Sequence, residues 1–140
     1  MYVFAWPAYW VYFRRKIPRT RVILQNGSDI LMVKQWIGDG RWQLPGGGLL
    51  RQEDPAAGAA RELHEETGII LEPKTLNLLG KGSETRRGLS FDYYAYQASV
   101  ERKDLKLQKI EISDAGWLPT SSLGVYNTVP DALASIRMLK

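Results

Sequence analysis

The chain has 140 residues and no cysteine, and its 19 Lys and Arg against 15 Asp and Glu give a net charge of +4. That length fits one domain with a genuine hydrophobic core, and a composition that is 44% apolar and 24% charged is that of a globular fold. A disulfide framework, thiolate metal sites and cysteine nucleophiles are excluded. The modest positive excess suits a small polyanionic partner such as a nucleotide and is too weak to predict a stable nucleic-acid complex. A chain without cysteine also fits a reducing compartment, so we expect a cytoplasmic location.

The N-terminal end is unusually aromatic. Residues 2–13 hold seven of the 15 aromatic side chains, and Arg14, Arg15 and Lys16 follow them. The apolar run is shorter than the roughly 20 residues that cross a bilayer, and its basic residues follow it, unlike those of a signal peptide. We therefore treat residues 1–16 as an extension and residues 17–140 as the domain. Packing on the domain or in a homodimer is favoured over contact with a membrane surface, and a tail without a fixed role stays open.

The hydrophobic pattern predicts the elements that follow. Two strands flank Asn26-Gly27, which is typical of a tight hairpin. The remaining predictions in chain order are a loop at 38–40, short extended pieces at 41–50, a helix at 54–67, a strand at 69–71, a strand at 76–82, a polar loop at 83–88, a strand at 89–100, a mixed segment at 111–118 and a closing helix at 130–140. The two hairpin strands are expected at 19–25 and 30–36. Strands outnumber helices, so we predict an α/β sandwich with helices on the faces of a mixed sheet.

The helix expected at 54–67 has clear ends. Asp54 is a good N-cap residue, Pro55 suits the first helical position, and Gly68 is a typical stop. One side of the helix is made mostly of small residues, which allows close packing against a sheet: Ala56, Ala60, Leu63 and Thr67.

A second side of the same helix is acidic. Glu62, Glu65 and Glu66 fall within roughly 100° of arc. A solvated acidic face is one interpretation. The context favours another, because a triple glycine at 46–48 precedes the helix and lets a ligand approach closely. Carboxylate and carbonyl oxygens are the ligands that Mg²⁺ prefers. We also expect Arg61 to pair with Glu53 and tie the loop to the helix.

These residues together resemble the Nudix box, G-x5-E-x7-R-E-U-x-E-E-x-G-U, in which U is a bulky aliphatic residue. The stretch from Gly47 through Glu53 and Arg61-Glu62-Leu63-His64-Glu65-Glu66-Thr67-Gly68 to Ile69 matches at every fixed position. The lead-in at 42–47 is similar to that of the family. Glu111, six residues before Trp117, resembles an acid on a later strand that often joins the metal site.

The resemblance implies a Nudix-type three-layer α/β/α sandwich and a pyrophosphohydrolase that depends on Mg²⁺ or Mn²⁺ and cleaves a nucleoside diphosphate linked to a further moiety. It implies the following roles: metal ligands at the Gly46 carbonyl, Glu65, Glu66 and Glu111, a ligand or general base at Glu62, and helix-orienting residues at Glu53 and Arg61. A nucleoside triphosphate, or its modified or deoxy form, is the default substrate. A nucleotide sugar or a dinucleotide is the alternative, and a catalytically silent nucleotide-sensing module is the competing function.

Four residues outside the carboxylate cluster are candidates for binding the substrate. Arg86 and Arg87 carry the guanidinium groups suited to phosphates, although a plain surface loop explains them equally well. Trp42 and Phe91 could stack on a base, although strand aromatics more often belong to the core. His64 falls far from the acidic face, so we expect a structural or exposed side chain.

Overall fold

The computed structural model describes residues 17–36, 40–86, 88–101, 105, 112–124, 126 and 128–139. The extension at 1–16, with the membrane and dimer interpretations attached to it, lies outside these residues, as do Arg87, Glu111 and most of the loop predicted at 38–40. No helix within the described ranges is long and apolar enough to cross a membrane.

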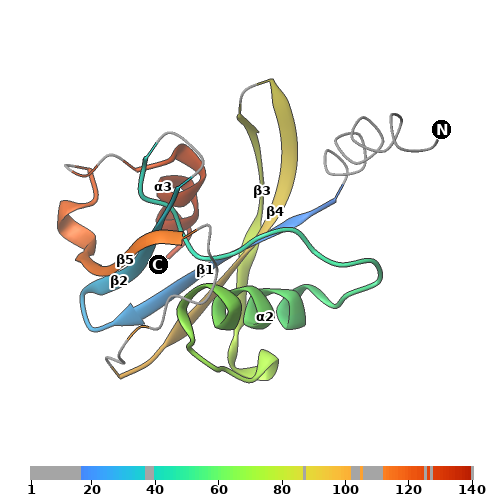
Figure 1. The fold of residues 1–140 in the computed structure, drawn as a ribbon, viewed down its shortest axis with the longest axis horizontal. Helices are drawn as coiled ribbons and strands as arrows, with labels where there is room; N and C mark the ends of the chain where they lie inside the picture. The colour runs from blue at the N-terminus through green and yellow to red at the C-terminus, as the bar shows by residue number, and fades with distance from the viewer. Residues whose placement is uncertain are drawn as a thin grey trace.

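A five-stranded sheet forms the middle of the fold, in the order β3-β4-β1-β2-β5 (Figure 1). Its strands are β1 (Arg19–Asn26), β2 (Asp29–Gln35), β3 (Asn77–Arg86), β4 (Leu89–Ser99) and β5 (Ile112–Pro119). β1 and β4 run parallel, and the other neighbours are antiparallel. The sheet is therefore mixed, as predicted. Where the sequence predicted a segment of mixed secondary structure at 111–118, the structure has strand β5 over Ile112–Pro119.

Both hairpins turn tightly. Asn26 pairs with Asp29 across the first turn, where Gly27 has a φ of 59°, so the hairpin signal is confirmed. Arg86 pairs with Leu89 across the second turn. The loop predicted at 83–88 is therefore wrong over 83–86, which belongs to β3. These polar residues lie in a hairpin at the edge of the sheet, which has a solvent-exposed face. On that face, side-chain hydrogen bonds join the two strands.

The strand predicted at 69–71 is also wrong. The chain there forms no ladder and leads into a 3-10 turn, η1 (Pro73–Thr75). Ile69 is buried in the core directly after the helix, whereas Ile70 is exposed. The aliphatic pair therefore reflects one anchoring residue rather than a strand.

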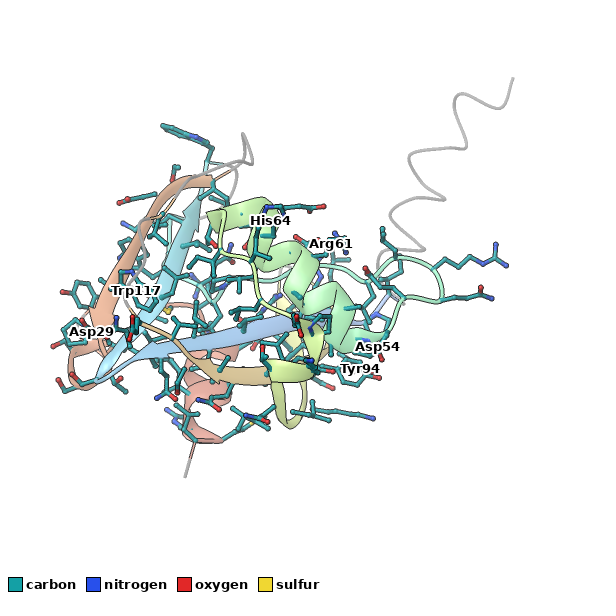
Figure 2. The ribbon with its side chains drawn as sticks, turned by 90° about the horizontal axis from the view of Figure 1, so that it is seen from below. Asp29, Asp54, Arg61, His64, Tyr94 and Trp117 are labelled. Carbon is teal, nitrogen blue, oxygen red and sulfur yellow. The ribbon has the colours of Figure 1, made fainter. Side chains whose placement is uncertain are left out.

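Both helices in the described part of the chain begin where the sequence predicts. In α2 (Pro55–Thr67), the Asp54 carboxylate accepts a hydrogen bond from the Ala57 N–H at the N-terminus, and Gly68 ends the helix with a φ of 79°. Asp54, Arg61 and His64 follow this helix in Figure 2. The closing helix α3 (Pro130–Arg137) is shorter than predicted. A second 3-10 turn, η2 (Thr120–Ser122), lies between β5 and α3.

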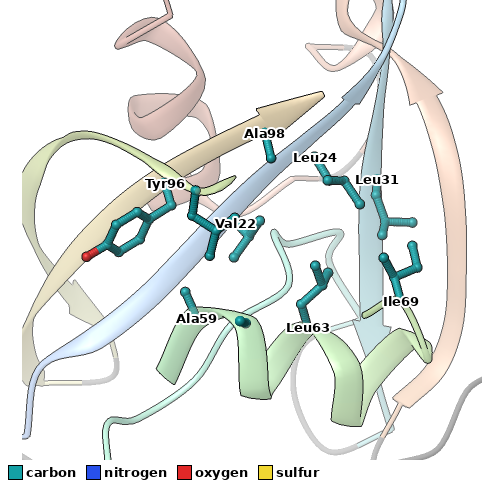
Figure 3. Packing of buried hydrophobic residues seen from close by; sticks show 10 residues of the cluster. Val22, Leu24, Leu31, Ala59, Leu63, Ile69, Tyr96 and Ala98 are labelled. Atoms are coloured by element: carbon teal, nitrogen blue, oxygen red, sulfur yellow. The ribbon is translucent and has the colours of Figure 1, made fainter. Parts of the chain in front are cut away.

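The helices cover opposite faces of the sheet. Along β1, Val22 and Leu24 belong to a core cluster with Leu63 of α2, and Figure 3 shows these side chains facing the helix. Ile23, between them, packs instead with Ala132 of α3, because successive strand residues point to opposite faces. The predicted three-layer α/β/α sandwich is confirmed, with α2 close to the sheet on its small residues.

The sheet opens between β1 and β2. Within the described residues their ladder joins only two residue pairs, at the hairpin end. Beyond it, the segment 43–48 fills the gap. Gln43 exchanges both backbone hydrogen bonds with Val33 of β2, while the carbonyls of Pro45 and Gly47 accept from β1 at 2.9 Å and 2.8 Å. The glycine run therefore lies inside the sheet layer, next to α2.

Candidate active site

The acidic side of α2 faces the glycine run. Glu62 and Glu66 are buried, with 6% and 2% of their surface exposed, whereas the Glu65 side chain is 39% exposed. A solvated acidic face therefore does not describe Glu62 and Glu66. Burial of a carboxylate is unfavourable unless its charge is compensated. The hydrogen bonds and ion pairs of Glu62 and Glu66 therefore determine the chemistry that these carboxylates can perform.

Glycine is required where the segment passes these carboxylates. The Gly46 N–H donates to Glu66 Oε2 at 3.1 Å. A side-chain carbon at Gly46, whose φ is 150°, would collide with the Thr20 carbonyl oxygen, and one at Gly47 would lie 2.6 Å from the Glu62 carboxyl carbon. Backbone and carboxylates therefore touch directly, at a distance that no other residue type allows.

Arg61 holds the carboxylates of the loop and the helix together. Its Nε and Nη2 donate to the two oxygens of Glu53 at 2.9 Å and 3.0 Å, a bidentate pair. Nη1 donates to Glu62 at 3.1 Å and to Glu65 at 3.2 Å. Nη2 also reaches the Gly48 carbonyl at 3.1 Å. The predicted Arg61–Glu53 pair is confirmed, and the same guanidinium contacts two further acids.

This pairing shifts the ionisation of both partners. The hydrogen bond from Arg61 lowers the pKa of Glu53 below its usual 4.5, helped by the Leu50 N–H and opposed by burial. The hydrogen bond to Glu53 raises the pKa of Arg61 above its already high usual value. Both groups are therefore charged at neutral pH, and the loop at 48–53 is fixed to α2 by a charge-assisted contact.

Gly58 is a site residue that the sequence prediction missed. A side-chain carbon there would collide with Leu49 and lie 2.9 Å from Glu53 Oε1. Glycine inside a helix is unfavourable by about 1 kcal/mol relative to alanine. Its presence in the middle of a predicted helix was a signal of close approach by another segment.

A group of three or more Asp, Glu or His side chains arranged to hold a metal ion is absent from the described part of the chain. The guanidinium of Arg61 stands between Glu62 and Glu65, since one nitrogen, Nη1, contacts both. Arg61 contacts three of the four carboxylates, and the Gly46 N–H contacts the fourth, Glu66. The oxygen donors suit a hard divalent cation, which would have to replace Nη1 at Glu62 and Glu65.

The structure does not bring the predicted stacking residues to the carboxylates. Phe91 is buried, with the guanidinium carbons of Arg19 and Arg21 at 5.0 Å and 5.4 Å from its ring centroid. The Trp42 ring lies under the Lys34 ammonium at 4.6 Å and packs against the core cluster of α3. Both aromatics therefore have structural contacts on the face that α3 covers.

Of the four other predicted residues, the structure describes the side chain of His64 but not those of Arg86, Arg87 and Glu111. His64 is exposed, as expected. Arg86 ends β3, and its side chain lies outside the described part of the structure together with Arg87 and Glu111. Their proposed contacts with phosphate or metal stay predictions.

Comparison with known proteins identifies the family. The family model of the NUDIX domain matches residues 15–138. An RNA pyrophosphohydrolase from Thioalkalivibrio sulfidiphilus is 41% identical over 64 residues, which cover 46% of this chain and 36% of that protein. The chain spans less than half the length of the first curated relatives that it matches, from 31% to 42%.

Solved structures agree in fold. The crystal structure of a MutT Nudix hydrolase from Burkholderia pseudomallei superimposes with a TM-score of 0.79 at 20% identity, covering 89% of this chain and 98% of that one. The Nudix domain of NrtR from Shewanella oneidensis, solved with ADP ribose, gives a TM-score of 0.75 at 19% identity, covering 88% and 85%. Given the matched family model and the box at 47–69, this chain belongs to the Nudix family.

Proposed function

We propose that this chain is a divalent-metal-dependent pyrophosphohydrolase that cleaves a phosphoanhydride bond in a nucleoside diphosphate linked to a further moiety. The observation that carries the proposal is the gathering of Glu53, Glu62 and Glu65 around the Arg61 guanidinium, next to Glu66, which accepts from the Gly46 N–H. Carboxylate oxygens are the ligands that a hard divalent cation prefers, so the cluster favours a metal-dependent reaction. Repulsion from a polyphosphate would also be strong unless cations screened it.

The backbone supports Gly46 as a further oxygen donor. The carbonyls on either side of it, at Pro45 and Gly47, point to β1, whereas the Gly46 N–H points to Glu66. Backbone groups alternate in direction along an extended segment. The Gly46 carbonyl is therefore proposed to face α2, together with the Glu65 and Glu66 carboxylates, as the set that would hold the metal.

The other acids have distinct proposed tasks. Glu62 is a ligand or the base that removes a proton from the attacking water, and its burial against Gly47 fixes its orientation. Glu53 and Arg61 orient the loop and the helix and are not in the proposed ligand set. When bound, Mg²⁺ or Mn²⁺ would neutralise phosphate oxygens and acidify water.

The proposed substrate is a nucleoside triphosphate, or its modified or deoxy form. Its hydrolysis would give a monophosphate and pyrophosphate, whereas a nucleotide sugar or dinucleotide would give a monophosphate and the phosphorylated remainder. The net charge of +4 is consistent with a polyanion. Base and sugar pockets vary within one fold, so the choice among these substrates depends on the loops and strands around the carboxylates.

A nucleotide library tests this function. The purified protein is incubated with each compound in Mg²⁺ and separately in Mn²⁺, and the products are identified by mass. The Glu62→Gln variant, which keeps the size of the side chain and removes its charge, is run beside it. Metal-dependent cleavage of a phosphoanhydride that Glu62→Gln abolishes supports the proposal. Binding of nucleotides without any cleavage would indicate a sensing module and refute it.

A further inference from the structure

We propose that the buried ion pair between Arg21 of β1 and Asp131 of α3 is a positioning device for the Glu66 carboxylate, acting through the Thr20 carbonyl and Gly46. The inference rests on the proposed function, since it concerns how the metal-binding carboxylate is held. It makes α3, on the far face of the sheet, part of what sets the geometry of the site on the α2 face.

The ion pair is almost fully removed from solvent. Arg21 Nε donates to Asp131 Oδ2 at 2.6 Å, and the two side chains are 5% and 0% exposed. Desolvation of two charges offsets most of their attraction, so a buried pair contributes little net stability compared with apolar residues of similar volume. A role in fixing position accounts better for such a pair than a role in stability does.

A continuous series of contacts leads from this pair to Glu66. Arg21 Nη1 donates to the Thr20 carbonyl oxygen at 2.8 Å. Gly46 packs so closely on that oxygen that a side-chain carbon would collide with it. The Gly46 N–H in turn donates to Glu66 at 3.1 Å, and the Thr20 N–H binds the Gly47 carbonyl at 2.8 Å. A shift of the Thr20–Arg21 peptide would therefore move the donor that holds Glu66.

The guanidinium is suited to this task. Its planar fork donates to Asp131 from Nε and to Thr20 from Nη1 at the same time, and the Phe91 ring packs on it with the centroid 5.4 Å from Cζ. Lysine has a single ammonium group on a flexible stem and does not reproduce a fixed two-point contact. Arg21→Lys thus keeps the charge opposite Asp131 while loosening the hold on Thr20.

The experiment distinguishes an effect on the position of the Glu66 carboxylate from an effect on the stability of the protein. The main variant is the double substitution Arg21→Met with Asp131→Leu, which replaces the pair by apolar side chains of similar volume. Arg21→Lys is made in parallel and keeps the test decisive if the double variant does not fold. The matched control is Ala132→Gly, which weakens α3 beside Asp131 without touching the pair. Three quantities are measured in the full chain: the melting temperature, hydrogen exchange of the Gly46 amide without metal, and the Mn²⁺ dissociation constant by calorimetry.

The expected results differ between variants. The double variant melts near the wild-type temperature, yet its Gly46 amide exchanges faster and its Mn²⁺ dissociation constant rises by about tenfold or more, the usual effect of losing a partner that orients a metal ligand. Arg21→Lys shows the same two changes. Ala132→Gly lowers the melting temperature and leaves Mn²⁺ affinity at the wild-type value.

Three results would overturn the inference: wild-type Mn²⁺ affinity in the pair variants, unchanged exchange at Gly46, or an equal loss of affinity in Ala132→Gly. Failure of the proposed function is recognised separately, because the wild-type protein would then bind no Mn²⁺. In that case the Gly46 amide still decides whether the series of contacts operates.

Discussion

Replacing Gly47 by alanine is the sharpest test of the close approach between the loop and α2. The added methyl carbon would lie 2.6 Å from the Glu62 carboxyl carbon and 2.7 Å and 2.9 Å from its oxygens. To restore an ordinary contact of 3.4 Å, the carboxylate or the backbone has to retreat by about 0.8 Å. Glu62 is buried, so it has little free space into which to move.

The size of the effect follows from that overlap. Forcing an extra methyl group into a packed site usually destabilises a protein by about 1–3 kcal/mol. A displacement near 1 Å in a catalytic group can lower the rate by about 100-fold. We therefore expect Gly47→Ala to remain folded, with a lower melting temperature by circular dichroism. Its turnover of the nucleotide identified in the library should fall by about two orders of magnitude.

The neighbouring glycine provides the control. Among the described residues, a methyl carbon at Gly48 meets only the Ile17 Cγ2 atom at 3.7 Å, an ordinary contact, and Gly48→Ala keeps the carbonyl that binds Arg61. The two variants differ by one position in the same loop and carry the same chemical change. Wild-type turnover in Gly47→Ala, or an equal loss in Gly48→Ala, would refute the idea that direct contact with Glu62 is what requires glycine.

Three further predictions concern other parts of the chain. Glu66→Gln should stay folded by circular dichroism, because the amide oxygen can still accept from Gly46, while kcat falls by orders of magnitude with the loss of a charged ligand. Because Arg61 lowers the pKa of Glu53, the extra stability of wild type over Glu53→Gln should be present above about pH 4.5 and disappear as pH falls through the lowered pKa, as melting temperatures across pH will show. Removing residues 1–13 should change solubility or elution volume on sizing more than kcat, and an unchanged elution volume would argue against a role in a dimer.

The features that the sequence predicted correctly are local ones. The ends of α2 follow from Asp54, Pro55 and Gly68, whose preferences depend on a few neighbouring residues. The Arg61–Glu53 pair follows from a fixed spacing between loop and helix. These predictions succeeded because short-range geometry limits the distance between the groups involved.

The wrong or missing predictions concern features that depend on residues from other parts of the fold. The polar residues 83–86 form an edge strand since their partner strand, not their own composition, orders them. Glu62 and Glu66 lie on a helical side that could equally have been solvated, and they are buried where the glycine segment packs against them. The partner of Arg21 lies 110 residues away along the chain, so periodicity and spacing carry no information about it.

The divergence of β1 and β2 links these observations. If the two strands paired along their whole length, the segment with Pro45 and Gly46 would have no place within the sheet, and α2 would face side chains alone. Because they separate, the backbone at Gly46 and Gly47 makes hydrogen bonds to β1 on one side and contacts Glu62 and Glu66 on the other. The opening also lets Gly46 pack against the Thr20 carbonyl oxygen, which accepts a hydrogen bond from Arg21. Residues from both faces of the sheet can thus influence one carboxylate cluster.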